Sequence, residues 1–351
     1  MHIERKQRVI DIALAGFGGV ARALVRILAE LPPGESPAFR VVALSDSSGC
    51  VLDRAGLDQG RLVDLAQAKE GGVCLGAAPA ARRGPEALVE ALGRDWPSIL
   101  VEVGPTELAD GGGSKRRALA ALRAGSSLVL ASKGPVASAW DELVEAAGGS
   151  ADVARRIRCS ATVGAGMPVI DAGRSLALGS PIRGIAACLN GTSSLVLGLM
   201  EEGLGLDEAI ARAQELGMAE ADPSADLDGH DAAAKLCILS RTVLGAPLLP
   251  AEVLRESVRC ATASRIANAR RAGARLRAVG RLRLEGGRTS ASIRLEEVPE
   301  TSPLAVSGGS CAVVFDSERA GELSLVGKGA GPVETASALL RDLRILTGAQ
   351  R

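Results

Sequence analysis

A short apolar strand followed by closely spaced glycines constrains the fold of this chain more than any other feature. In VIDIALAGFGGVARALVRILAE, residues 9–30, an apolar run leads into glycines and then into a helix with an apolar face. The first glycine allows a tight turn, and the second lets the backbone approach a pyrophosphate at the helix N-terminus. A glycine turn in an ordinary strand–helix–strand unit is the alternative. The predicted dinucleotide contacts are Gly16, Gly18, Gly19 and Val20.

A second strand, FRVVALSD, ends at Asp46, about 25 residues after the glycine motif. An acidic residue about 20 residues after such a motif typically accepts a hydrogen bond from a ribose 2′-OH. Asp46 would repel a 2′-phosphate and therefore favours NAD. Because Ser45, Ser47, Ser48 and Arg54 are close in sequence and could host a phosphate, NAD and NADP both stay open.

Buried strands then continue to alternate with helices. PSILVEVG (97–104) and SSLVLASKGPV (126–136) are typical of strands, and the helical segment GSKRRALAALRAG lies between them. This alternation predicts the α/β class with a doubly wound, parallel, Rossmann-type sheet. Ligands of such sheets bind beyond the carboxyl ends of the strands, which is where Thr106 and Lys133 lie. We expect both residues at the cofactor; a solvated loop lysine is the alternative for Lys133.

The composition excludes several classes of function. The 41 acidic residues balance the 41 basic ones, and aromatic residues make up 1% of the chain. Binding of nucleic acid would need a basic excess or an aromatic stacking surface. No run approaches the ~18 apolar residues of a membrane helix. Seven scattered cysteines without a CxxC pair, together with only two histidines, indicate a reduced, cytoplasmic protein without a zinc cluster or a histidine-based catalytic site.

The segment EADPSADLDGHDAAAKL, residues 220–236, places a lysine among carboxylates. Lysine is rare here, since 35 of the 41 basic residues are arginine, which cannot lose its proton in a protein. Asp231 and Lys235 are four residues apart and share one face of an otherwise apolar helix. A surface ion pair worth ~0.3–0.5 kcal/mol is the alternative. We favour a proton-transfer lysine beside a hydride acceptor, with Glu220, Asp226 and Asp231 suited to a substrate ammonium group.

Four other segments carry weaker signals. ATVGAGMPVI (161–170) places small residues in a turn, where backbone carbonyls could face a ligand or cation. After a strand, Asn190-Gly191-Thr192 leads into a helix, which we expect to begin near Thr192 with a hydroxyl cap. Residues 273–306 alternate as antiparallel strands around a Gly286-Gly287 hairpin. A second glycine turn, with Gly329, precedes the last helix and could cover the cofactor; a plain loop is the alternative.

Over nearly its full length the chain resembles homoserine dehydrogenase. The segment containing Glu220 to Lys235 is the most specific of those that carry the resemblance. The matching segments are GFGGVA, VALSDSSG, ASKGPVA, ATVGAGMPVI, RGIAACLNGTSS, AQELGMAEADPSADLDGHDAAAKL and GKGAGPVETA.

The resemblance implies a function and roles for individual residues. The family oxidises L-homoserine to L-aspartate 4-semialdehyde with NAD(P)⁺ and usually runs in reverse in threonine and methionine biosynthesis. The position of Lys235 is its proton donor and acceptor, and Lys133 would lie by the substrate and nicotinamide. The substrate would be held at Glu220, Asp226 and Asp231, and the turn at Gly329 would touch the cofactor. A sodium ion would be held mostly by backbone carbonyls of Ser160, Val163, Ala165 and Met167.

The resemblance also implies a domain organisation. We expect a Rossmann domain over residues 1–134, completed by 311–351, and a substrate-binding and dimerisation domain over 135–310 with a mixed or antiparallel sheet. The implied assembly is a homodimer. The implied form is the short one, without a kinase or regulatory domain, so feedback control through such a domain is not expected.

The sequence departs from the family pattern at two places. Ser132 stands where the family usually has asparagine before the lysine, and Ser160 stands where it usually has glutamate. The first change bears on cofactor contacts and the second on the cation site. Two other functions stay open: a Rossmann oxidoreductase acting on another amino-acid semialdehyde, and a non-catalytic NAD(P)-binding sensor. Scarcity of histidine argues against a phosphorylating semialdehyde dehydrogenase, which needs a cysteine with a histidine base.

Overall fold

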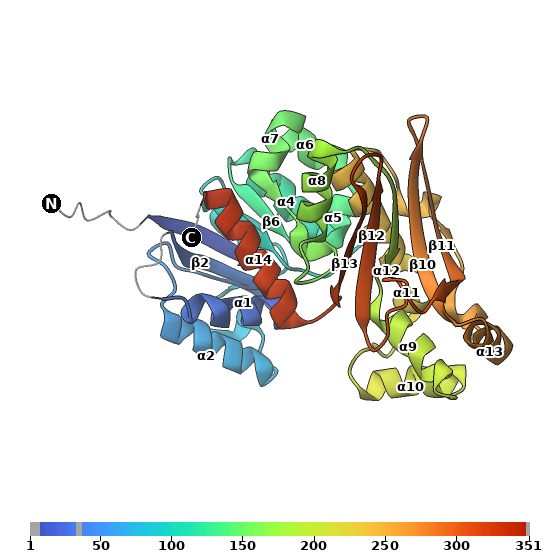
Figure 1. Cartoon of the computed structure of the whole chain (residues 1–351). Helices are drawn as coiled ribbons and strands as arrows, with labels where there is room; N and C mark the ends of the chain where they lie inside the picture. The colour runs from blue at the N-terminus through green and yellow to red at the C-terminus, as the bar shows by residue number, and fades with distance from the viewer. Residues whose placement is uncertain (1–7, 33–36, 349–351) are drawn as a thin grey trace. The chain divides into compact units, whose positions relative to one another are not determined.

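The computed structural model describes residues 8–32 and 37–348. The chain divides into two compact units, one made of residues 1–161 and 332–351 and the other of residues 162–331. Each unit is built around one β-sheet, and the first unit is completed by a segment from the far end of the chain (Figure 1).

The sheet of the first unit has seven strands in the order β4-β3-β2-β1-β5-β6-β7. β1 pairs in parallel with β2 and β5, and parallel pairing continues through β6 to β7. This confirms the predicted parallel Rossmann-type sheet; the antiparallel edge formed by β3 and β4 was not predicted. The strands span Val9–Ala15 (β1), Ala38–Asp46 (β2), Gly49–Leu52 (β3), Arg82–Arg83 (β4), Ile99–Glu102 (β5), Ser127–Leu130 (β6) and Ile157–Arg158 (β7).

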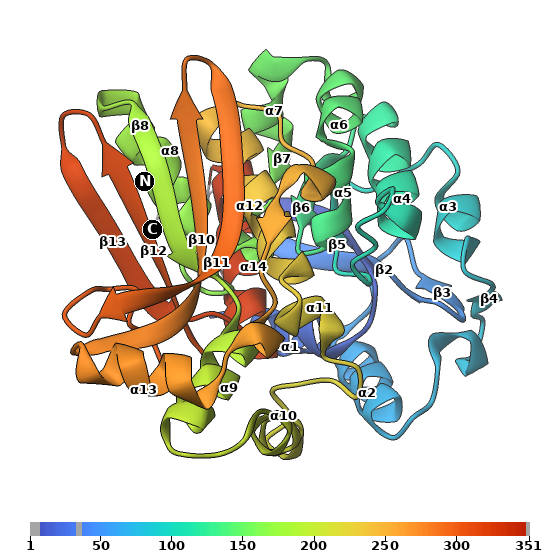
Figure 2. The ribbon, with the colours of Figure 1, turned by 90° about the vertical axis from the view of Figure 1, so that its right-hand side faces the viewer.

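Helices cover both faces of this sheet, as a doubly wound fold requires (Figures 1 and 2). α1 packs beside α2 and α14, while α4 packs beside α5 and α6. Leu14 of β1, Leu24 of α1 and Leu339 of α14 are fully buried in one shared core. The helices span Gly19–Ala29 (α1), Gln59–Glu70 (α2), Ala87–Leu92 (α3), Gly112–Arg123 (α4), Lys133–Ser138 (α5), Trp140–Ala147 (α6), Ser150–Arg156 (α7) and Pro332–Thr347 (α14).

The second unit contains a six-stranded sheet in the order β13-β12-β8-β10-β11-β9. Neighbouring strands are antiparallel except β9, which runs parallel to β11. The predicted hairpin is confirmed: Gly286 and Gly287 have positive φ angles of 56° and 77° and join β10 to β11. The strands span Ile182–Cys188 (β8), Leu254–Arg255 (β9), Ala274–Glu285 (β10), Arg288–Pro299 (β11), Ser310–Ser317 (β12) and Gly321–Lys328 (β13).

Helices of the second unit pack on its sheet through small residues. Gly280 of β10 lies against Leu236 of α12, and Gly173 of α8 lies against Phe315 of β12. Figure 2 shows the sheet seen with α8 and α12 behind it. The helices span Val169–Gly179 (α8), Gly191–Glu201 (α9), Leu206–Glu215 (α10), Ser224–Leu227 (α11), His230–Leu239 (α12) and Ala263–Arg271 (α13), and a π-helical turn at Ser240–Leu244 follows α12.

The unit boundaries differ from the sequence-based ones at residues 134 and 311. Residues 135–161 belong to the first unit because β7 pairs with β6 there. Residues 311–331 belong to the second unit because β12 pairs with β8 and β13 pairs with β12. Strand pairing, which the sequence pattern leaves open, sets both boundaries.

In residues 8–32 and 37–348, the helices are all too short or too polar to cross a membrane.

Candidate functional site

Two positions in the turn after β1 require glycine for different physical reasons. Gly16 has a φ of +98°, and a Cβ there would lie 2.8 Å from the backbone of Val103 and Gly104. Gly18 has an ordinary φ of −80°, and nothing lies within 4 Å of where its Cβ would be. α1 therefore begins with open space at its N-terminus, no side-chain cap and no acidic residue in its first turn. These features fit a bound phosphate group.

The next two predicted contacts are the first residues of α1. A Cβ at Gly19 would lie 3.5 Å from the ring of Pro332, at the start of α14. Val20 is half-buried and packs against the core of the first unit. Both place backbone N–H groups in the first turn of α1, where such groups lack an intrahelical partner.

Asp46 lies at the end of β2, as predicted, but its carboxylate is already bonded. One oxygen accepts hydrogen bonds from the backbone N–H of Ser48 at 2.8 Å and from its hydroxyl at 2.5 Å. The other accepts from Lys69 at 2.5 Å and from the backbone N–H of Leu75 at 3.1 Å. Burial raises the pKa of Asp46, but these donors outweigh it and lower the pKa to about 2. Lys69 was missed by the sequence analysis, although it is one of only six lysines.

Thr106 and Lys133 follow β5 and β6 as predicted. Thr106 is exposed, and Lys133 is the half-buried first residue of α5. The two loops touch: the Ser132 hydroxyl donates to the Pro105 carbonyl at 3.2 Å. Ser132 is thus part of the link that brings the two strand ends together.

In the second unit, Lys235 is buried rather than at the surface. Its side chain is 9% exposed, and its amine lies 2.7 Å from an Asp231 carboxylate oxygen. The amine also donates a hydrogen bond to the Leu189 carbonyl at 2.6 Å. The interpretation as a weak surface ion pair is therefore wrong, because desolvation changes the energetics of the pair.

The charge on Lys235 is subject to opposing effects. Burial lowers its pKa, whereas the carboxylates of Asp231 and Asp226 and the nearby Cys311 raise it. The net result is a pKa above the ordinary lysine value.

Asn190 organises the carboxylates and was missed as a site residue. Its amide nitrogen donates to Asp226 at 2.6 Å and to Asp231 at 3.0 Å. Its oxygen accepts from the Ser193 N–H at 2.8 Å, so Asn190 caps α9. The expected hydroxyl cap near Thr192 is wrong, since the Thr192 hydroxyl donates to a carbonyl elsewhere. The preference of asparagine for the N-cap position could have identified this cap from the sequence.

Glu220 stands apart from this cluster. It is exposed in the loop before α11, and its backbone carbonyl accepts a hydrogen bond from Gln214 at 3.0 Å. Among the described residues, the Glu220 carboxylate forms no hydrogen bond or ion pair with Lys235, Asp231 or Asn190.

Gly329 and Lys235 are brought near each other by Cys311. A Cβ at Gly329 would lie 1.9 Å from the Cys311 sulfur, so only glycine fits beside this thiol. Cys311 is fully buried; burial raises the pKa of its thiol, and the positive charge of Lys235 partly opposes this rise. The glycine turn after β13 and Lys235 of α12 thus both lie beside Cys311 of β12.

The residues expected at a sodium ion lie in the segment between β7 and α8. The Ser160 hydroxyl donates to Asp342 at 2.7 Å and lies 3.5 Å from a guanidinium nitrogen of Arg158, whose positive charge would oppose a cation. The Met167 carbonyl accepts a hydrogen bond from Val169. Val163 and Ala165 are buried, and Ala165 has a strained φ of +50°. The sodium site stays a prediction, and no step is assigned to a cation.

Comparisons with known proteins agree with these motifs. The homoserine dehydrogenase family model matches residues 168–344. Homoserine dehydrogenase of Methanocaldococcus jannaschii is 32% identical, over 95% of this chain and 97% of that protein. NAD(+)-dependent homoserine dehydrogenase of Pseudomonas canavaninivorans is 37% identical, over 95% of this chain and 94% of that protein.

Solved structures give the same result. A hyperthermophilic archaeal homoserine dehydrogenase in complex with NADPH is 30% identical with a TM-score of 0.79, covering 98% of this chain and 99% of that one. A homoserine dehydrogenase from Thiobacillus denitrificans is 27% identical with a TM-score of 0.79, covering 97% and 74%. The chain belongs to the homoserine dehydrogenase family.

Proposed function

We propose that this chain interconverts L-homoserine and L-aspartate 4-semialdehyde with NAD(P), and that Lys235 is the proton donor and acceptor. The observation that carries the proposal is the buried amine of Lys235, oriented by Asp231 and the Leu189 carbonyl. A positioned amine of this kind suits proton transfer to and from an oxygen atom at the reacting carbon.

Lys235 would act in both directions. When bound, NAD(P) supplies the hydride acceptor for oxidation and the hydride donor for reduction. In oxidation, neutral Lys235 accepts the substrate hydroxyl proton while the C–H bond at the same carbon breaks. In reduction, protonated Lys235 gives this proton to the carbonyl oxygen. The raised pKa of Lys235 keeps it protonated at neutral pH, which supports reduction, the biosynthetic direction toward threonine and methionine.

Charged side chains are proposed to hold the substrate. Asp226 and Asp231 offer negative charge beside Lys235, and Asn190 fixes both carboxylates before the substrate arrives. Glu220 is proposed as a third substrate contact on the strength of the motif. Lys133, at the start of α5, is proposed to hold the substrate hydroxyl or carboxylate.

The proposed cofactor is NAD or NADP. The open N-terminus of α1 supports a pyrophosphate there, as does the absence of any side chain at Gly18. The residues proposed to line the cofactor are Gly16, Gly18, Gly19, Val20, Asp46, Thr106, Lys133 and Gly329.

A homodimer is also proposed, through the second sheet. Gly327 of β13 faces Met167, so the adjacent Val326 points to the opposite face, where it is 57% exposed. A single exposed apolar side chain is ordinary on a protein surface, so the family resemblance carries this proposal. A single-chain mass in analytical ultracentrifugation would contradict this proposal.

The direct test is NAD(P)H formation by the purified protein with L-homoserine, tried separately with NAD⁺ and NADP⁺. We expect turnover, and the ratio of the two rates gives the coenzyme preference. A folded protein that binds NAD(P) without turnover would instead favour a sensor or an oxidoreductase with a different substrate.

The Lys235→Arg variant tests the proposed role of the lysine. We expect unchanged thermal unfolding and a loss of turnover of at least ~10²-fold, because arginine keeps the charge but cannot exchange the proton. Lys115→Arg is the matched control, since Lys115 forms a surface ion pair with Glu142. Near-normal turnover of Lys235→Arg would overturn the assignment.

A further inference from the structure

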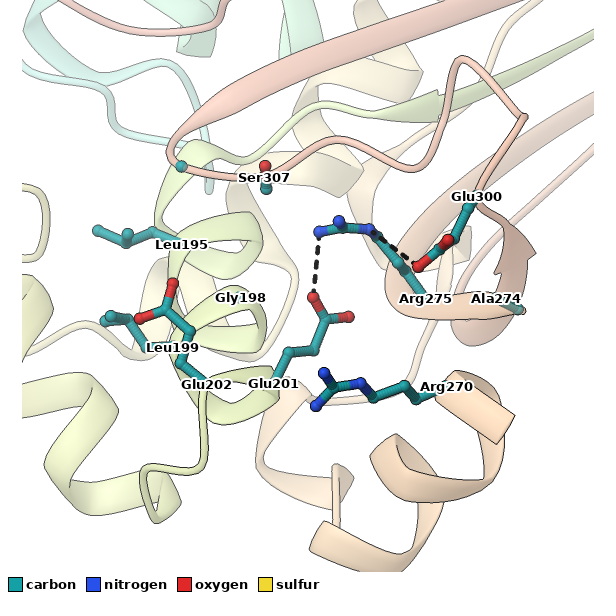
Figure 3. Close-up of a pocket in the computed structure, with 11 residues that line it drawn as sticks. Leu195, Gly198, Leu199, Glu201, Glu202, Arg270, Ala274, Arg275, Glu300 and Ser307 are labelled. Atoms are coloured by element: carbon teal, nitrogen blue, oxygen red, sulfur yellow. Dashed lines mark hydrogen bonds and ion pairs between the residues drawn. The ribbon is translucent and has the colours of Figure 1, made fainter. Parts of the chain in front are cut away.

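A cavity lies in the second unit, and no residue of the Lys235 cluster lines it. It has a volume of about 460 Å³ and lies between the C-terminal half of α9, the end of α13 and the start of β10 (Figure 3). No residue proposed above for catalysis, substrate or cofactor lines it. Cavities of roughly 300–1,000 Å³ are the usual size for small-molecule sites.

The cavity carries charges of both signs. Figure 3 shows carboxylates reaching in from α9 and guanidinium groups from α13 and β10. Arg275 lies 3.4 Å from Glu201 and 4.0 Å from Glu300. Within the described part of the chain, Glu202 and Arg270 line the cavity without any ion pair. One negative and one positive group are therefore available to a ligand.

The wall of the cavity is fixed before a ligand binds. Arg277 is fully buried and donates to both carboxylate oxygens of Glu201, at 2.7 and 3.1 Å. Arg277 also donates to the Val306 carbonyl, which holds the neighbouring loop. Glu201, fixed in this way, in turn positions Arg275. A binding site held in place by its own structure loses less entropy when a ligand binds.

We propose that this cavity binds a small zwitterion, namely a free α-amino acid with an apolar side chain. Its carboxylate would lie at Arg270 and Arg275, its ammonium group at Glu202, and its side chain against Leu195 and Leu199, which line the same cavity. A simple anion would be repelled by the carboxylates and a simple cation by the guanidinium groups, so the mixed charge selects a ligand that carries both.

Two contacts connect this cavity to the substrate cluster within the same unit. α9 ends at the cavity and begins at Asn190, which holds Asp226 and Asp231. The loop with Ser307 and Gly308 lines the cavity, and the carbonyl of the next residue lies 2.8 Å from where a Cβ of Gly191 would be. We therefore expect occupancy to change the KM for homoserine.

Calorimetric titration of the full chain with L-leucine tests the site, independently of turnover. We expect L-leucine to bind. N-acetyl-L-leucine, which lacks the ammonium group, and L-leucinamide, which lacks the carboxylate, should each have a dissociation constant at least ~10-fold higher. L-Leucine binding that is retained in Asp231→Asn excludes binding at the substrate cluster, where Asp231 pairs with Lys235. Equal binding of the neutralised analogues, or no L-leucine binding, would overturn the proposal.

Substitutions locate the site. Glu202→Gln and Arg270→Gln should each weaken L-leucine binding at least ~10-fold. Arg271→Gln is the matched control, because Arg271 is exposed on the same helix and does not line the cavity. L-Leucine binding that survives both substitutions would overturn the site. Binding without any change in the KM for homoserine would keep the site and overturn its coupling to the substrate cluster.

Discussion

Lys235 is buried beside groups that act on its charge in opposite directions. Burial favours the neutral amine, and Asp231, at 2.7 Å, favours the protonated one. Oxidation of homoserine needs the neutral form, so its rate should rise with pH as the proton leaves. Reduction needs the protonated form, so its rate should fall over the same range.

Replacing Asp231 by asparagine should move this pH dependence. Without the carboxylate, burial has the larger effect and the pKa of Lys235 falls, so the rise in kcat for oxidation moves to lower pH. The measurement is kcat against pH for both directions. Asp222→Asn is the matched control, since Asp222 is exposed and bonds to Ser224. An unshifted profile in Asp231→Asn would show that Asp231 does not set the charge of Lys235.

Lys69 should influence the choice of coenzyme. It bonds to Asp46 and offsets a negative charge that would repel a 2′-phosphate. Lys69→Ala should therefore weaken NADP⁺ binding by ~10-fold or more while changing NAD⁺ binding less. Calorimetric dissociation constants for both coenzymes decide this. Lys115→Ala serves as the control, and an equal loss for both coenzymes would contradict the argument.

At the scale of the elements, the turn between β1 and α1 contains one glycine that the backbone conformation requires and one that we propose cofactor binding requires. Gly16→Ala should lower stability by at least ~1–2 kcal/mol, because it combines a positive φ with a close backbone contact. Gly18→Ala meets open space, so thermal unfolding should stay unchanged while NAD(P) affinity drops. Unfolding curves and dissociation constants for both variants test this. Equal destabilisation by the two substitutions would disprove the distinction.

The sequence predicted the elements with strong apolar patterns. β1, β5 and β6 are short buried runs between helices, and the glycine pair at 286–287 favours a tight hairpin turn between two alternating segments. The antiparallel strands β3 and β4 were not predicted, because β3 is only four residues long and Arg82 and Arg83 of β4 are exposed without an apolar pattern. The double role of Asn190 was also missed, since its partners Asp226 and Asp231 lie 36 and 41 residues later in the chain.

At the scale of the whole molecule, the first unit is discontinuous in sequence. That the end of the chain returns to the Rossmann unit was predictable from the second glycine turn and the helix after it. The place where it returns was not, because an alternating apolar pattern does not say which sheet a strand joins. β12 and β13 could be assigned to the second unit only from their pairing with β8.

This discontinuity leads to a prediction about fragments. Leu339 and Leu343 of α14 are fully buried in the first core, each worth ~1.5–3 kcal/mol against a typical stability of ~5–15 kcal/mol. A fragment of residues 1–161 should therefore be poorly folded. Its circular dichroism signal should be weak, and it should show no cooperative unfolding transition near neutral pH. The same fragment joined to residues 332–351 by a flexible linker of about 12 residues should unfold cooperatively. A cooperative transition in the shorter fragment would contradict this expectation.

Because α14 is at the end of the chain, the unit that is synthesised first is not the unit that can finish folding first. A ribosome releases the chain from its N-terminus, so every strand and helix of the second unit emerges before residues 332–347. The nucleotide-binding unit thus begins first and is finished last, and until then the apolar groove that receives α14 stays uncovered. During translation, this groove is the part of the nascent protein on which a chaperone would act.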